Sequence, residues 1–239
     1  MKMKNPRITV ITVTFNAVNI IEKTILSVVN QEYANIEYII IDGNSTDGTV
    51  ELIKKYDSYV TLWISESDEG IYDAMNKAIR RATGDWLLFI NGGDILLSIP
   101  IKDLVMANNY DAVCGRVKTG NTIVYPSFSW KMKLSNLLPH QGLFYRRERM
   151  HSLYDIASYK IFSDYDYNLK MYEIGQKIFI SDTIIAKHSL DGVSNDPKYI
   201  KELYSVIFNN CGLFFVILSF LRFKYIGLKK TLSKLFYKS

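Results

Sequence analysis

Side chains that can bind a cation or a polar ligand follow four short apolar segments in the first hundred residues. These polar groups lie at residues 14–16, 42–49, 66–70 and 91–94. Three of the four contain carboxylates, among them Asp42, Asp68 and Asp94. Carboxylates that lie close together repel one another unless a cation or hydrogen-bond donors face them. If the groups meet in the fold, they predict a site for a divalent cation or for a ligand with hydrogen-bond donors.

The apolar segments have the periodicity of strands that alternate with helices. Continuously apolar or β-branched stretches predict strands, at residues 8–13, 38–41, 60–65 and 86–90. Apolar residues at helical spacing predict helices, at residues 20–29, 49–56 and 72–82, the last of which should stop before Gly84. Such alternation is typical of a parallel sheet built from βαβ units. Ligands bind at the carboxyl ends of parallel strands, so the four polar groups should meet there.

Beyond Pro100 the pattern is less regular. It predicts further strands, at residues 112–118, 123–125, 142–145 and 177–180, and one helix, at residues 165–172. The first two of these strands should form a hairpin that turns near Gly120. We expect one unit over residues 1–196, with a regular α/β half (1–98) and a mixed half (99–196), followed by a C-terminal tail (197–239).

The chain lacks the common glycine-rich phosphate motifs. No Gly-x-Gly-x-x-Gly occurs, so a dinucleotide-binding fold has no fingerprint. Gly43 and Gly48 have the spacing of a P-loop, but Thr49 stands where the phosphate-binding lysine belongs. A nucleotidyltransferase, which also joins an α/β sheet to acids and a metal, would need a basic, glycine-rich loop early in the chain. Residues 14–19 contain none.

Several motifs resemble, in the order in which they occur, those of the family-2 glycosyltransferases. They are Thr14-Phe15-Asn16, Asp42-Gly-Asn-Ser-Thr-Asp-Gly-Thr49, Asp68-Glu-Gly-Ile-Tyr-Asp-Ala-Met-Asn76-Lys77, Gly84-Asp-Trp86 and Asn91-Gly-Gly-Asp94. The resemblance runs from Ile8 to about Ser194 and favours the short bacterial enzymes that build O-antigens and exopolysaccharides. It implies the α/β GT-A fold, whose Rossmann-like, mostly parallel sheet binds a nucleotide-diphosphate sugar with a divalent metal. It also makes residues 1–98 the nucleotide-sugar-binding half and residues 99–196 the acceptor half.

The resemblance assigns six residues to nucleotide-sugar binding, namely Thr14, Asn16, Asp42, Asp68, Asn76 and Lys77. The Asp42 carboxylate would accept a hydrogen bond from an N–H of the base, which we expect to be uracil, and Asp68 would close the same pocket. The structural alternative for residues 42–49 is a turn followed by a helix cap, because Asp, Asn, Ser and Gly all favour turns.

The metal site is expected at Asp94. This residue corresponds to the last acid of the family's DxD-type motif, which coordinates Mg²⁺ or Mn²⁺ on the diphosphate and assists its departure. Gly92 and Gly93 stand where another acid is usual, so the ion would depend on one carboxylate, substrate phosphates and water. His188 lies where some relatives place a third metal or phosphate ligand. The structural alternatives are a helix cap at Asp94 and a structural role for His188.

The second half should supply the acceptor side. The segment Phe162-Ser-Asp-Tyr-Asp166 resembles the family's Glu-Asp-Tyr-Asp segment, with serine in place of the glutamate. The resemblance implies that Asp164 is the base that takes the proton from the attacking hydroxyl, whereas Asp166 would point away on a helix. His140 and Gln141 resemble the acceptor-binding loop. Asp164 could instead cap the helix that begins beside it.

The excess positive charge lies in the C-terminal tail. The chain has 29 Lys and Arg against 24 Asp and Glu, and six of the basic residues and no acid fall between Arg222 and Ser239. The remainder is close to neutral, whereas a nucleic-acid-binding domain would spread basic residues over one face. Apolar residues recur at three- or four-residue spacing from Leu221 to Phe236. We therefore predict a basic amphipathic helix on an anionic membrane surface; the alternative is a helix packed on the core.

Taken together, these features predict an inverting, metal-dependent glycosyltransferase that moves a hexose or N-acetylhexosamine from a UDP-sugar to a saccharide acceptor. We expect an undecaprenyl-diphosphate-linked acceptor, an enzyme peripheral to the cytoplasmic face of the bacterial cell membrane, and no nucleic-acid partner. Two distant cysteines fit a reducing cytosol, and no apolar stretch reaches the about 20 residues of a spanning helix. The alternative is a membrane-peripheral nucleotide-sugar-binding or scaffold protein with a degraded site, which Gly92, Gly93 and Ser163 favour.

Overall fold

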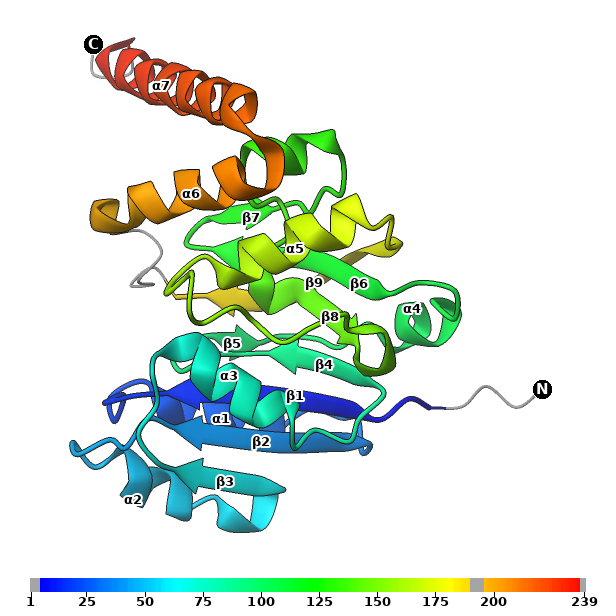
Figure 1. The fold of residues 1–239 in the computed structure, drawn as a ribbon. Coiled ribbons are helices and arrows are strands. Elements are labelled where there is room, and N and C mark those ends of the chain that lie inside the picture. Colours follow the sequence, from blue (N-terminus) through cyan, green and yellow to red (C-terminus); the bar gives the residue numbers. More distant parts are fainter. Residues whose placement is uncertain (1–4, 190–195, 237–239) are drawn as a thin grey trace.

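The computed structural model describes residues 5–189 and 196–236, which form a nine-stranded sheet with helices on both faces (Figure 1). The strands are β1 (Ile8–Thr14), β2 (Ile36–Asp42), β3 (Leu62–Ser65), β4 (Trp86–Phe89), β5 (Ile95–Leu96), β6 (Ala112–Thr119), β7 (Thr122–Val124), β8 (Leu143–Arg146) and β9 (Ile178–His188). The helices are α1 (Ile21–Val29), α2 (Thr49–Lys54), α3 (Ile71–Ile79), α4 (Ile101–Met106), α5 (Ser163–Glu173), α6 (Ile200–Cys211) and α7 (Leu213–Phe236). Of the short 3₁₀ turns, η2 (Trp130–Leu134) packs against α5, α6 and α7, and η3 (His140–Gly142) packs against β4, β6 and β9.

The sheet has two halves that differ in strand direction. Its order is β3-β2-β1-β4-β8-β6-β9-β5, and β7 pairs with β6. Strands β3, β2, β1 and β4 are parallel, and Thr14 and Asp42 lie in register at the carboxyl ends of β1 and β2. Antiparallel pairs begin at β4 and β8 and lie in the second half. The predicted fold class, a Rossmann-like parallel half joined to a mixed half, is confirmed.

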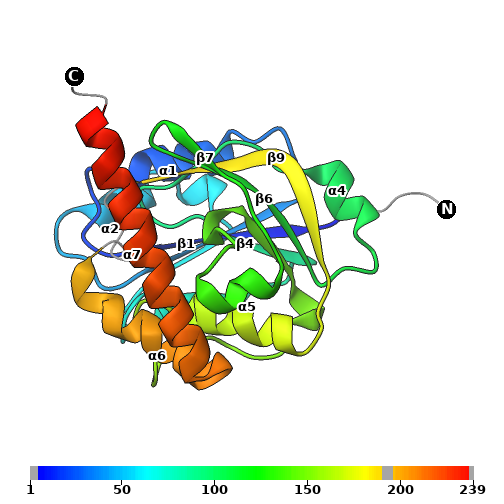
Figure 2. The same cartoon turned by 90° about the horizontal axis from the view of Figure 1, so that it is seen from above.

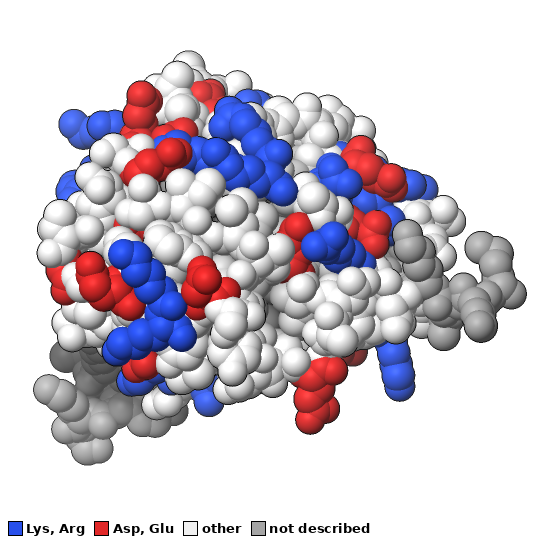
Figure 3. Space-filling model, turned by 90° about the horizontal axis from the view of Figure 1, so that it is seen from below, with Lys and Arg blue, Asp and Glu red and all other residues white. Residues whose placement is uncertain are grey.

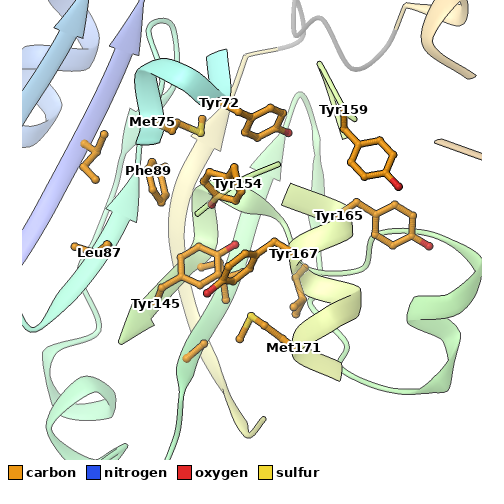
Figure 4. Close-up of a cluster of buried hydrophobic side chains, with 14 of the residues drawn as sticks. Tyr72, Met75, Leu87, Phe89, Tyr145, Tyr154, Tyr159, Tyr165, Tyr167 and Met171 are labelled. Carbon is orange, nitrogen blue, oxygen red and sulfur yellow. The ribbon is translucent and has the colours of Figure 1, made fainter. Parts of the chain in front are cut away.

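Each face of the sheet carries a hydrophobic core. On β1, Ile11 and Val13 point to one face and Ile8 and Val10 to the other, because successive side chains of a strand alternate. Helices α3, α5 and α6 cover the first face, and α1, α2 and α4 cover the second. The first core contains many tyrosines, which fill the space between α3, the sheet and α5 (Figure 4). Strands β1, β2 and β4 are thus buried on both faces, which explains their apolar sequences, whereas the edge strand β3 is half-buried.

The ends of helix α3 and strand β9 differ by three residues or more from those that the sequence pattern predicts. Helix α3 ends at Ile79, well before Gly84. Gly84 instead allows the backbone before β4 to pass close to β1, because an added Cβ would lie 2.6 Å from the backbone nitrogen of Thr9. Strand β9 continues past residue 180 to His188, since its second part pairs with both β5 and β6. The polar residues 181–183 hide this continuation in the sequence.

Helices α6 and α7 lie at one end of the molecule, with α7 outermost (Figures 1 and 2). Two polar residues attach α7: the Ser219 hydroxyl donates to the carbonyl of Leu134 at 2.7 Å, and the Arg222 guanidinium donates to the Ser135 hydroxyl at 2.5 Å. The same helix exposes a set of large apolar side chains, namely Leu213, Phe214, Ile217, Phe220, Leu221 and Tyr225. No helix among the described residues is both long enough and apolar enough to cross a membrane. The described part of the C-terminal tail is therefore mostly helical, as predicted, and contacts the core through Ser219 and Arg222.

Charged side chains of both signs are interspersed on the face of the molecule shown in Figure 3. Lys and Arg lie there beside Asp and Glu, and they form no continuous basic stripe. The net charge of +5 is therefore not gathered on this face as one field that would attract a polyanion.

Candidate active site

The loops after β1 and β2 form the first part of the site. The backbone N–H of Gly43 donates to the carbonyl of Thr14 at 2.9 Å. Asn16, in the left-handed backbone region with φ +46°, ties the two loops together. Its Oδ1 accepts from the N–H of Thr46 at 3.0 Å, and its own N–H donates to the Ser45 hydroxyl at 2.7 Å. The fold thus brings Thr14, Asn16 and Asp42 together, and their contact with a nucleoside stays a prediction.

The Asp42 carboxylate is buried and makes its hydrogen bonds within the protein. Its Oδ2 accepts from the N–H of Ser45 at 2.9 Å and from the Ser65 hydroxyl at 2.7 Å. Its Oδ1 accepts from the Ser45 hydroxyl at 2.5 Å. These bonds fix the loop that carries Gly43 over the strand ends. The N–H of a base would have to share the remaining lone pairs of this carboxylate.

Asp68 and Phe15 both lie against Gly43. An added Cβ at Gly43 would be 2.6 Å from Oδ2 of Asp68 and 3.4 Å from the Phe15 ring, so glycine leaves room for both. Oδ1 of Asp68 accepts from the N–H of Gly70 at 2.9 Å, and the Phe15 side chain is 64% exposed. An exposed ring can stack on a base, and a carboxylate beside it can accept a hydrogen bond from an N–H of that base. Phe15 is not among the predicted site residues, although an aromatic residue directly after a strand is a usable signal.

Asn76 and Lys77, on α3, have their hydrogen-bond partners within the protein. The Asn76 amide donates to the carbonyl of Tyr154 and accepts from its N–H, both at 2.9 Å. Nζ of Lys77 pairs with Glu66 at 3.2 Å and with Asp73 at 3.3 Å. The pKa of Lys77 is raised, because the effect of the two acids outweighs the lowering effect of burial. Asn76 thus positions Tyr154, Lys77 holds the loop at residues 66–70, and their predicted role in donor binding stays untested.

Asp94 and His188 form the second part of the site. Nδ1 of His188 lies 2.9 Å from Oδ1 of Asp94, which also accepts from the N–H of Ser189 at 2.9 Å. Asp94 is 3% exposed and precedes the short strand β5, so the alternative of a helix cap is wrong. Among the residues that the structure describes, no group of three or more His, Cys, Asp or Glu side chains could hold a metal. A cation at this pair would need further ligands from a bound diphosphate and water.

Gly92 and Gly93, which stand where another acid is usual, are required by the backbone around Asp94. Gly93 has φ +99°, in the left-handed region that favours glycine. An added Cβ at Gly92 would lie 2.9 Å from the Thr14 hydroxyl. A side chain at either position would strain the turn or displace its neighbour. The backbone geometry therefore explains why glycine occupies these two positions, without any loss of function.

Asp164 lies in the first turn of α5, where two donors hold its carboxylate. The Tyr72 hydroxyl donates to Oδ1 at 2.7 Å, and the Asn136 amide donates to Oδ2 at 3.1 Å. Helix α5 begins at Ser163 with Phe162 as its N-cap residue, so Asp164 lies inside the helix, and the alternative that it caps a helix starting at Tyr165 is wrong. Asp166 points away, as predicted, and accepts from Asn210 of α6 at 2.8 Å. Asp164 thus has a fixed orientation and keeps lone pairs for a further donor.

The turn η3 connects Asp164 with the Asp94–His188 pair. Nδ1 of His140 lies 3.9 Å from Oδ2 of Asp164, and the side-chain amide of Gln141 lies 2.8 Å from Nδ1 of His188. Neither ring nitrogen of His140 has a hydrogen-bond partner in the described part of the chain. Burial lowers the pKa of His140, and the opposing charge of Asp164 is the smaller effect. A neutral imidazole without a hydrogen-bond partner therefore lies beside the predicted base, and its contact with an acceptor stays a prediction.

The family model described as "Glycosyl transferase family 2" matches residues 9–165 of this sequence. The chain belongs to this family. The match extends from the first strand to Asp164, and so includes the loops at the strand ends. As the motifs predict, the protein is therefore a nucleotide-sugar-dependent glycosyltransferase. This result excludes the nucleotidyltransferase alternative.

Two relatives with similar sequences are named as glycosyltransferases. A "PGL/p-HBAD biosynthesis glycosyltransferase" of Mycobacterium bovis (strain BCG / Pasteur 1173P2) is 25% identical over 223 residues, which cover 84% of this chain and 85% of the relative. An "uncharacterized glycosyltransferase" of Haemophilus influenzae is 31% identical over 148 residues, 57% of this chain and 58% of the relative.

The fold is similar to that of solved glycosyltransferases. S. aureus TarS in complex with UDP-GlcNAc matches with a TM-score of 0.67 and 20% identity, over 84% of this chain and 64% of that chain. The mannosyltransferase PcManGT from Pyrobaculum calidifontis, in complex with GDP-Man and Mn²⁺, matches with a TM-score of 0.63 and 16% identity. The match covers 97% of this chain and 81% of that chain. The chain spans 38% of the length of another TarS structure. At these identities the likeness shows the fold.

Proposed function

We propose that the enzyme transfers a hexose or an N-acetylhexosamine from a UDP-sugar to a saccharide acceptor, with inversion at the anomeric carbon. The observation that carries this proposal is the position of η3 between two centres. Nδ1 of His140 lies 3.9 Å from Asp164, and Gln141 contacts the His188 that pairs with Asp94. A base and a carboxylate–imidazole pair thus lie on either side of one short turn. In-line displacement needs such a separation of base and leaving group around the reacting carbon.

In the proposed step, Asp164 takes the proton of the acceptor hydroxyl as the O–H bond breaks. The hydroxyl oxygen forms the new bond to C1 of the sugar. The bond between C1 and the diphosphate oxygen breaks, and its electron pair leaves with UDP. Positioned proton transfer of this kind contributes typically about 10²–10⁴-fold to a rate. His140, which burial keeps neutral, is placed to hydrogen-bond a hydroxyl of either sugar.

The preference for a uridine nucleotide rests on the surroundings of Gly43. Phe15 and Asp68 offer a stacking surface and an acceptor for the N–H of the base. Thr14, Asn16 and Asp42 form the strand-end loops on which this pocket is built. The TarS structures with UDP and with UDP-GlcNAc support the same donor class.

A divalent cation, Mg²⁺ or Mn²⁺, fits the Asp94–His188 pair. A buried carboxylate beside an imidazole supplies oxygen and nitrogen donors of the kind that Mn²⁺ accepts, and Mg²⁺ is often held by one carboxylate with substrate phosphates. When bound, the ion would neutralise charge on the departing diphosphate. The presence of Mn²⁺ in the related PcManGT structure supports this proposal.

For the acceptor, we propose an undecaprenyl-diphosphate-linked sugar at the cytoplasmic face of the bacterial membrane, as in O-antigen or other polysaccharide synthesis. The support comes from α7, whose outward side chains include Phe214, Ile217 and Phe220. The sequence from Arg222 onward adds six basic residues and no acid. An apolar stripe flanked by basic residues is the pattern of helices that lie on anionic membranes.

The decisive experiment is a transfer assay with UDP-sugars, Mn²⁺ and a synthetic alkyl-diphosphate-linked N-acetylglucosamine. We expect UDP release and a glycosylated lipid of inverted configuration with the wild-type enzyme. Asp164→Asn should abolish transfer and retain UDP binding. Asp166→Asn is the matched control, because this acid lies on the same helix but points to α6. Activity of Asp164→Asn at the wild-type rate would contradict the assignment of the base.

The same assay separates the enzyme from a nucleotide-sugar-binding or scaffold protein with a degraded site. That alternative is favoured by the lack of a three-residue metal group in the described part of the chain. It predicts that UDP stabilises the protein but that no UDP-sugar is turned over. Turnover with any UDP-sugar excludes it.

A further inference from the structure

We propose that Tyr72 is a positioning residue for Asp164, so that the helix that follows the donor-side loop also orients the base of the acceptor side. The inference rests on the proposed function, in which Asp164 takes the acceptor proton. Tyr72 is not one of the site residues predicted from the sequence. It lies 92 residues before Asp164 in the chain.

The contact is a direct hydrogen bond between the two functional groups. The Tyr72 hydroxyl lies 2.7 Å from Oδ1 of Asp164 and 2.7 Å from the backbone carbonyl oxygen of Ile161, so its one proton is shared between the two acceptors. Asn136 donates to Oδ2 of Asp164 at 3.1 Å. Each carboxylate oxygen therefore has one protein donor, and the plane of the carboxylate is fixed by two bonds. A carboxylate has about four lone-pair positions, so an acceptor hydroxyl can still approach.

Tyr72 is suited to act as a lasting donor. Burial raises the pKa of Tyr72 well above its ordinary value, and the neighbouring charge of Asp164 adds to the effect. The hydroxyl therefore keeps its proton at any pH at which the enzyme would work. The ring is also held in place, since it packs on Tyr154 with centroids 5.1 Å apart (Figure 4).

The place of Tyr72 on α3 connects the two halves of the site. The helix begins at Ile71, directly after the loop in which Asp68 accepts from Gly70. Asp164 belongs to α5, on the other half of the chain. A displacement of the loop at residues 66–70 would thus move Tyr72 and reorient the base. Small errors in the position of a catalytic group cost rate even when substrate still binds.

The test is Tyr72→Phe, which removes the hydroxyl and keeps the ring. Tyr165→Phe is the matched control, because Tyr165 is also buried, and its hydroxyl also donates to a backbone carbonyl, that of Met132 at 2.6 Å. Both variants lose one buried hydroxyl, but only Tyr72 contacts Asp164. The assay measures kcat and KM for UDP-GlcNAc with the alkyl-diphosphate-linked acceptor, as a function of pH, and thermal unfolding of each variant is recorded.

We expect Tyr72→Phe to lower kcat by about tenfold or more and to leave the dissociation constant of UDP within about twofold. Its pH–rate profile should differ from that of the wild type, because the variant removes one of the two side-chain donors to the Asp164 carboxylate. Tyr165→Phe should lose similar thermal stability but keep the wild-type kcat and pH profile.

The outcomes separate this inference from the proposed function. If the wild type transfers sugar, Asp164→Asn is inactive, and Tyr72→Phe matches Tyr165→Phe in kcat and pH profile, the role of Tyr72 is overturned and the function stands. If the wild type turns over no UDP-sugar, the proposed function fails and the role of Tyr72 with it.

Discussion

Nδ1 of His188 lies 2.9 Å from Oδ1 of Asp94, although 94 residues separate the two in the chain. Strand β9 makes this contact possible, because it pairs with β5 directly after Asp94 and places Lys187 opposite Ile95. A carboxylate only accepts hydrogen bonds. Where Nδ1 of His188 donates to Asp94, the lone pair of Nε2 is left for a ligand, an arrangement common among metal-binding histidines.

We expect Asp94→Asn to abolish the effect of Mn²⁺ on nucleotide binding. A ligand at about 100 times its dissociation constant adds about 2.7 kcal/mol to the free energy of unfolding. In thermal unfolding with UDP, Mn²⁺ should increase the stabilisation of the wild type, and removal of the ion with a chelator should reverse it. Asp103→Asn, on α4, is the control and should behave as the wild type. Stabilisation by UDP that is the same with and without Mn²⁺ in the wild type would contradict the metal site.

Phe15→Ala should weaken UDP binding by about tenfold, because stacking of a base on an aromatic ring contributes roughly 1–3 kcal/mol. Titration calorimetry with UDP measures the change. The control is Tyr59→Ala, since this ring is similarly exposed but precedes β3, at the opposite end of the strands from the site. Equal affinity of Phe15→Ala and Tyr59→Ala for UDP would show that the base binds elsewhere.

The outer face of α7 should bind anionic membranes. Ile217 and Phe220 are exposed there, and we expect the double substitution Ile217→Ser and Phe220→Ser to lower co-sedimentation with phosphatidylglycerol vesicles severalfold. Met106→Ser, a similarly exposed apolar position on α4, should leave binding unchanged. Added salt should weaken the binding of the wild type, since salt screens the attraction of the basic residues. Wild-type protein that fails to sediment with these vesicles would contradict the proposal.

Acid should destabilise the fold through His140. Burial lowers the pKa of this imidazole in the folded protein, so below about pH 6.5, the ordinary pKa of histidine, the unfolded chain binds a proton that the folded protein does not. The free energy of unfolding should then fall as the pH decreases. His140→Gln should show a flatter decline in urea titrations between about pH 7 and pH 5. Parallel curves for the two proteins would mean that His140 titrates alike in both states. Burial also lowers the pKa of His151, which remains in both proteins and cancels in the comparison.

Much of the first half follows from local sequence. Apolar runs and helical spacing predict β1, β2, β3 and β4 and the helices between them, because continuous burial on both faces of a parallel sheet leaves a plain hydrophobic pattern. The polar loops follow these strands directly, so the meeting of Thr14, Asn16 and Asp42 also follows. The carboxyl ends of parallel strands necessarily lie at the same edge of the sheet.

Other features of the site depend on contacts between distant residues. The extension of β9 to His188 comes from pairing with β5 and β6, which no local pattern reveals. Asn76 is a motif residue, but its amide bonds the backbone of Tyr154 from a distant loop. The outward direction of Phe214 and Ile217 on α7 depends on how Ser219 and Arg222 attach the helix to the core.

By itself, the sequence determined the family, the order of strands and helices in the first half, and the residue types available for binding and proton transfer. These are properties of short segments, whose periodicity and polarity act on the chain locally. Only the tertiary structure decided that Asp94 pairs with His188, that η3 lies between this pair and Asp164, and that the Tyr72 hydroxyl contacts the Asp164 carboxylate. Each of these contacts joins residues far apart in the chain, and its geometry is fixed by strand pairing and by helix packing on a sheet buried on both faces.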